Sequence, residues 1–93
     1  MEELVLAYSG ASSQWADRAE ADLEQVAETG VSVVVDLTAS EDIDSPTLGL
    51  LALAQKRLRL KGGELSLVCG RSAVLRQLRR TGLDRTFPLR SAG

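Results

Sequence analysis

The run at 31–37, which reads VSVVVDL, constrains the fold more than any other part of the chain. Four of its seven residues are valine, and β-branched side chains favour extended backbone. Polar and apolar residues alternate little along the run, so we expect a central strand covered on both faces. Such a strand is typical of a layered α/β domain.

Helical and extended patterns alternate along the rest of the 93 residues. Strands are expected at 4–8, 31–37, 64–69 and 86–89. Helices are expected from near residue 14 to Gly30, at 46–60 and at 73–81, the first of them capped by Ser12 or Ser13. This order implies right-handed crossovers and a single domain over 1–93. The predicted fold class is α/β, with a mostly parallel mixed sheet of about four strands packed against helices.

Charge is divided unevenly between the two halves of the chain. Residues 1–45 carry 11 acidic and one basic side chain, whereas 46–93 carry 10 basic and two acidic. Complementary charge steers protein association, so this asymmetry is consistent with a protein partner. A fold that interleaves the halves would instead cancel the field, and both interpretations stay open.

The composition argues against several functional classes. The chain has no histidine, no P-loop glycine pattern and no paired nucleophile and base, so we expect no enzyme, no catalytic residue, no cofactor and no metal site. Negative net charge and only three aromatic residues disfavour nucleic-acid binding, despite an arginine-rich C-terminal half.

The expected compartment is the cytoplasm. No apolar run reaches the roughly 18 residues of a membrane span, and the acidic start is unlike a signal peptide. The single cysteine, Cys69, cannot form an internal disulfide and is expected to be a small buried residue.

The candidate site lies between the valine-rich strand and the next helix. Pro46 is well suited to the first helical position, which would place Ser45 at the N-cap. Function in α/β sheets gathers at the carboxyl ends of strands, where Asp36, Asp42 and Asp44 are also expected. A phosphate on Ser45 would be accommodated at the helix terminus and would add charge that repels a partner. From the residues alone, an ordinary helix cap explains Ser45 better.

Three sequence blocks change this interpretation. They read VVDLTASEDIDSPTLG at 34–49, GGELSLV at 62–68 and TGLDRTFP at 81–88. Together they resemble the STAS domain of anti-sigma factor antagonists, over about residues 31–89.

The resemblance implies a partner-switching role. In that family the unphosphorylated protein binds an anti-sigma factor with a serine-kinase fold, which then phosphorylates the serine that follows an aspartate, and a phosphatase restores it. Here that serine is Ser45, after Asp44. The expected partner-binding residues are Asp36, Asp42, Asp44, Ser45, Pro46, Thr47 and Leu48.

Two alternatives within the same fold stay open, as does the oligomeric state. Small STAS proteins also act as accessory subunits that bind the ATPase of lipid ABC transporters. Pro46 and Thr47 stand where the family usually has Ser or Thr and then Gly, so a divergent STAS interaction module that phosphorylation does not regulate is the second alternative.

Overall fold

The computed structural model describes residues 3–70 and 72–91. Its elements alternate along the chain as predicted. They are β1 (Glu3–Ala7), α1 (Ser12–Ala27), β2 (Ser32–Leu37), α2 (Ser45–Leu60), β3 (Leu65–Cys69), α3 (Ser72–Thr81), the 3₁₀ turn η1 (Leu83–Arg85) and β4 (Leu89–Ser91). The predicted α/β fold class is therefore confirmed.

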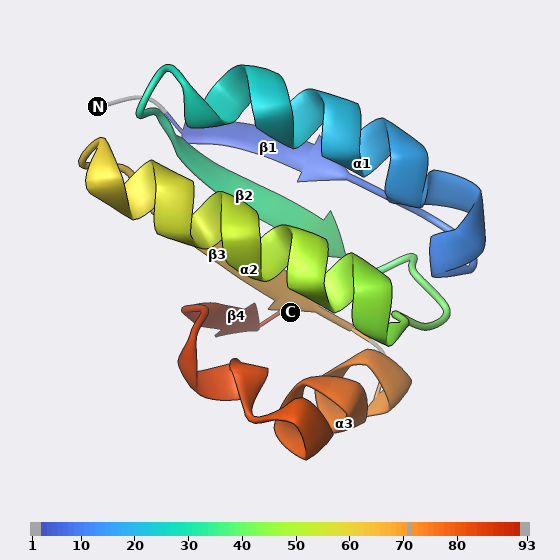
Figure 1. The fold of residues 1–93 in the computed structure, drawn as a ribbon. Helices are drawn as coiled ribbons and strands as arrows, with labels where there is room; N and C mark the ends of the chain where they lie inside the picture. The colour runs from blue at the N-terminus through green and yellow to red at the C-terminus, as the bar shows by residue number, and fades with distance from the viewer. Residues whose placement is uncertain (1–2, 71, 92–93) are drawn as a thin grey trace.

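The four strands form one sheet in the order β1-β2-β3-β4. All the described pairings are parallel, so the antiparallel strand that a mixed sheet would contain is not among them. Each crossover moves one place in the same direction. Right-handed crossovers of this kind place every helix on the same face of the sheet. Figure 1 shows α1 and α2 side by side over that face, with α3 beyond α2.

The core lies between this face and the helices. Alternate residues of the central strands, among them Val33, Val35 and Leu67, are fully buried. The predicted helical stripe from Trp15 to Val26 is buried against them. Because aromatic residues are few, aliphatic side chains fill most of this layer.

As predicted, the central strand β2 is covered on both faces, since Val33, Val34 and Val35 are all buried, but described helices lie over one face alone. The strand register places Val5 and Val34 together on the opposite face, and no described helix lies over it. Val34 is still only 5% exposed, whereas Val5 on the edge strand is 61% exposed. Arg90 of β4 forms an ion pair with Glu3 of β1, at 2.7 Å, and so joins the two edge strands across this face. Neighbouring side chains, rather than a second layer of helices, therefore cover the centre of the sheet.

The last strand begins later than predicted. A strand is expected at 86–89, but residues 86–88 after η1 are irregular and β4 starts only at Leu89. Pro88 has no N–H to donate to a strand neighbour. Its carbonyl oxygen accepts a hydrogen bond from the backbone N–H of Leu67 at 2.9 Å, and regular pairing then begins at the next residue.

A buried amide ties α2 to this C-terminal segment. The Gln55 side chain donates from Nε2 to the carbonyl oxygens of Leu65 at 2.9 Å and Thr86 at 3.1 Å. Its Oε1 accepts from the N–H of Leu65 at 2.6 Å. Gln55 thus satisfies backbone groups at the start of β3 and before β4 that would otherwise lack partners in the interior.

We predict that Gln55→Leu destabilises the fold by about 1–3 kcal/mol, because it leaves these buried backbone groups without hydrogen bonds at nearly constant side-chain volume. Urea unfolding followed by circular dichroism measures the change. The neighbouring exposed variant Lys56→Leu is the control and should shift stability by no more than about 0.5 kcal/mol. Equal unfolding midpoints for the two variants would contradict this role of Gln55.

Candidate functional site

Two loops run side by side where β1 and β2 end. The backbone N–H of Glu41 donates to the carbonyl oxygen of Gly10 at 2.9 Å, and Gly10 forms an isolated parallel bridge with Ser40. The buried Ser40 hydroxyl donates to the carbonyl oxygen of Tyr8 at 2.8 Å. These bonds hold the 38–44 loop, which leads into α2, in a fixed position beside the start of α1.

Hydrogen bonds also join the N-terminal ends of α1 and α2. The backbone N–H of Ser12 donates to Asp42 Oδ1 at 3.0 Å, so a residue from the other loop caps the first turn of α1. In return, the Ser12 hydroxyl accepts from the backbone N–H of Asp44 at 3.1 Å. Each helix end therefore depends on the position of the other. The predicted serine cap of α1 is wrong: Ala11 is its N-cap, and its backbone N–H donates to the side chain of Gln14 at 3.2 Å.

The N-cap of α2 is Asp44, one residue before the predicted cap. Asp44 Oδ1 accepts from the N–H of Thr47 at 2.9 Å, which is the usual bond from an N-cap side chain to the third helical residue. Ser45 and Pro46 are consequently the first and second residues of the helix. Proline suits this position equally well, because neither of the first two helical N–H groups has an intrahelical partner.

These hydrogen bonds also stabilise the charged form of Asp44. Bonds from the side chain and backbone of Thr47, with a smaller contribution from the Ser12 hydroxyl, hold the pKa of the Asp44 carboxyl below its ordinary value. Asp36 also bonds to nearby backbone, because its Oδ1 accepts from the N–H of Thr38 at 2.9 Å. All three predicted aspartates thus help to shape the backbone that carries Ser45.

The side chain of Ser45 is exposed at the start of α2. Its hydroxyl accepts one long hydrogen bond, 3.5 Å, from Nε2 of Gln77 on α3. Pro46 beside it is also exposed, but the side chains of Thr47 and Leu48 are buried in the core. The surface available to a partner at this corner is therefore formed by Ser45, Pro46 and the aspartates of the loop.

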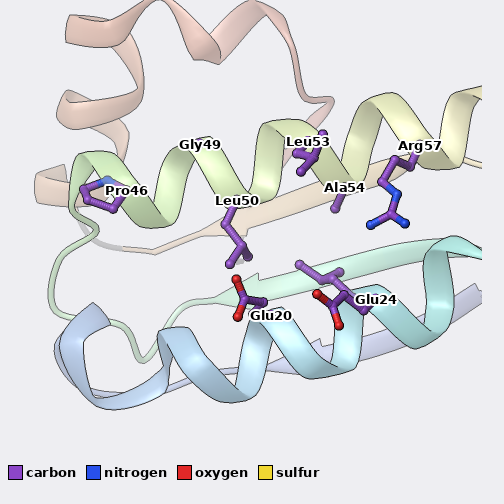
Figure 2. Close-up of a pocket in the computed structure, with 9 residues that line it drawn as sticks. Glu20, Glu24, Pro46, Gly49, Leu50, Leu53, Ala54 and Arg57 are labelled. Carbon is purple, nitrogen blue, oxygen red and sulfur yellow. The ribbon is translucent and has the colours of Figure 1, made fainter.

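A groove between α1 and α2 begins at the same corner, and the sequence analysis missed it (Figure 2). Its central hollow has a volume of about 320 Å³. It is lined by Glu20, Leu23 and Glu24 of α1 and by Pro46, Gly49, Leu50, Leu53, Ala54 and Arg57 of α2. The available signal was the spacing of Leu50, Leu53 and Leu60 by three and seven residues along the predicted helix.

Other features relevant to chemistry are sparse in the part of the chain that the structure describes. Cys69 is half-buried against the core, and burial raises the pKa of its thiol, which disfavours the reactive thiolate. The described residues contain no cluster of side chains suited to holding a metal ion. None of the described helices has the length and apolar character needed to cross a membrane.

We predict that Asp44→Ala lowers stability by about 1 kcal/mol at neutral pH through loss of the helix cap. The pKa of Asp44 is lowered in the folded state, so the stability that its charge supplies is present above the unfolded-state pKa, near 4, and is lost as pH falls through the lower folded-state value. Asp44→Asn should keep most of the cap and lose this pH dependence. Urea unfolding of the three proteins at a series of pH values tests this, and parallel pH profiles would contradict it.

Comparison with known proteins places this geometry in a family. The family model for the STAS domain matches residues 10–92. An anti-sigma factor antagonist from Mycobacterium paratuberculosis is similar in structure, with a TM-score of 0.78 and 32% sequence identity over 91% of this chain and 74% of that one. A Thermotoga maritima protein, provisionally assigned as an anti-sigma factor antagonist, has the same TM-score at 22% identity over 98% and 80% of the two chains, which shows the shared fold. Comparison with curated proteins gives no match. Since the STAS match extends over most of the chain and includes the whole 38–44 loop of the candidate site, the chain belongs to the STAS domain family.

Proposed function

We propose that this protein is an anti-sigma factor antagonist that acts by partner switching through the corner at Ser45. In its unphosphorylated form it binds an anti-sigma factor with a serine-kinase fold, phosphorylation of Ser45 releases that partner, and a phosphatase restores binding. The observation that carries the proposal is the exposure of Ser45 at the first helical position of α2, directly after the Asp44 cap. The similar protein from Mycobacterium paratuberculosis supports the general role.

The hydrogen-bonded corner supports a switch that acts on the partner rather than on the fold. Helix N-termini often stabilise phosphate through free N–H groups. Here Pro46 has no N–H, and the N–H of Thr47 already donates to Asp44. A phosphate on Ser45 would therefore gain few amide bonds and would stand beside the Asp44 carboxylate. It would add roughly −1.5 to −2 of charge to an exposed acidic surface.

The unphosphorylated form of the corner suits a partner that approaches closely. Ser45 is small, and its hydroxyl makes only the long hydrogen bond with Gln77. A partner that donates a hydrogen bond to Ser45, or packs on it, therefore has only this weak bond to displace. Asp42 and Asp44 are exposed as well as hydrogen-bonded, so their charge faces an incoming basic surface. Opposite charges at such an interface accelerate binding and select the partner.

We predict that Ser45→Ala retains the partner and Ser45→Asp loses it, by at least about tenfold in affinity, or roughly 1.4 kcal/mol. The expected partner is a protein with a serine-kinase fold, captured by the immobilised protein from a lysate of its own source and identified by mass spectrometry. Titration of the purified partner then gives the affinities. Gln25→Glu, an exposed residue of α1 outside the candidate site, adds the same charge and should bind as wild type does.

The outcomes separate the parts of the proposal. Equal binding by Ser45→Ala and Ser45→Asp would contradict the switch and leave a STAS module that phosphorylation does not regulate. Capture of a transporter ATPase in place of a kinase-fold protein would contradict the anti-sigma role and favour the accessory-subunit alternative. Both serine variants should unfold at the same urea concentration as wild type, because the hydroxyl makes one weak contact.

A further inference from the structure

The groove beside Pro46 continues along the full length of α2. The central hollow shares Pro46 and Leu50 with a smaller one of about 210 Å³ at the start of the helix. It shares Arg57 with a third, of about 380 Å³, that reaches Leu60 and Lys61 at the other end. We refer to these three adjoining hollows as the α1–α2 groove.

The α2 side of the groove is largely apolar although it faces solvent, and Arg57 and Lys61 are its charged residues. Leu53 is 57% exposed and Leu60 is 81% exposed, whereas Leu51 and Leu58 on the opposite side of the helix are fully buried. Pro46, Leu50, Leu53, Arg57 and Leu60 recur at alternating intervals of four and three residues. That spacing forms a single stripe along a helix and is the spacing by which one helix packs against another. Leu50 in this stripe also packs against the core, but the packing of α2 in this domain does not account for the exposed Leu53 and Leu60.

The α1 side of the groove is acidic. Its exposed carboxylates are Asp17, Glu20, Glu24 and Glu28, and they line the three hollows in turn. Figure 2 shows Glu20 and Glu24 pointing from α1 towards the Leu50 and Ala54 side. Among the described residues, the ion pairs are Arg59 with Glu64 and Arg90 with Glu3, so these two glutamates are unpaired within the domain. The groove thus places a largely apolar wall, with Arg57 and Lys61 as its charged members, opposite a row of carboxylates.

We propose that the α1–α2 groove binds an amphipathic helix of a protein partner. Its leucine-like side chains pack against Leu50, Leu53 and Leu60, and its lysine or arginine side chains lie opposite Glu20 and Glu24. The 16 residues of α2 correspond to roughly 24 Å, which is about four turns of a bound helix. This is the helix-in-groove mode of recognition, and it does not depend on phosphorylation of Ser45.

Charge and area favour this occupant over two others. An anionic membrane surface would be repelled by the acidic wall of α1. A second copy of the chain could supply only Leu53 and Leu60 as well-exposed large apolar side chains in the groove, whereas a stable dimer buries about 1,200–2,000 Å². A single amphipathic helix needs a narrower contact and supplies positive charge opposite Glu20 and Glu24.

The test uses a labelled 16-residue helical peptide with leucines at alternating intervals of three and four and lysines beside them. Fluorescence anisotropy should show that the wild-type protein binds it at least about tenfold more tightly than a scrambled peptide of the same composition. Leu53→Glu and Glu24→Lys should each weaken binding severalfold. Glu41→Lys is the matched control: it makes the same change of charge at an exposed residue of the 38–44 loop, outside the groove. Circular dichroism checks that each variant is folded.

A charge-reversal experiment tests whether Glu24 itself faces the basic side chains of the bound peptide. A peptide with glutamates in place of the lysines should bind Glu24→Lys better than it binds wild type, which is a coupling that a nonspecific effect would not produce. Equal binding of the ordered and scrambled peptides would overturn the proposal, as would an equal loss in Glu24→Lys and Glu41→Lys. So would a dimer of the free protein in sedimentation that Leu53→Glu dissociates, because the groove would then bind a second copy.

Discussion

The exchange of hydrogen bonds between Ser12 and the aspartates Asp42 and Asp44 is the constraint on which the functional edge depends. The first turn of any helix leaves backbone N–H groups without intrahelical partners. Here one of those groups on α1 is satisfied by Asp42, while the hydroxyl at that helix start accepts from the residue that caps α2. Neither helix can shift at this end without breaking bonds of the other. The corner that carries Ser45 is therefore held in place by both helices although it lies at the surface.

This arrangement gives the acidic residues of the loop two roles. The sequence predicts that Asp36, Asp42 and Asp44 place negative charge around Ser45. In the structure each uses a carboxylate oxygen to accept a backbone N–H, so each shapes the loop. Their charge remains at the surface, because Asp42 and Asp44 are exposed. Scaffold and recognition surface are thus formed by the same side chains, and removing one of them would change the geometry of the site as well as its charge.

The sequence predicted most elements because their apolar periodicity is strong, and it failed where two local signals compete. Asp44 and Ser45 are both good N-caps, and Pro46 is acceptable at either of the first two helical positions, so the cap was misplaced by one residue. The groove was missed because α2 is apolar over most of its first half. Composition cannot distinguish Leu51, which the sheet covers, from Leu53, which is exposed. That distinction follows from the arrangement of the helices in space.

The strand order supplies that arrangement, and it also brings the two proposed surfaces together at Pro46. Because all crossovers run in one direction, α1 and α2 lie side by side on one face, and the groove between them is open to solvent along its length. Ser45 lies at one end of α2, and Leu53 is eight residues further along, a rise of roughly 12 Å. At physiological salt the screening length is about 8 Å. Charge added at Ser45 is therefore felt most at the Pro46 end of the groove, beside the corner, and only weakly at its middle.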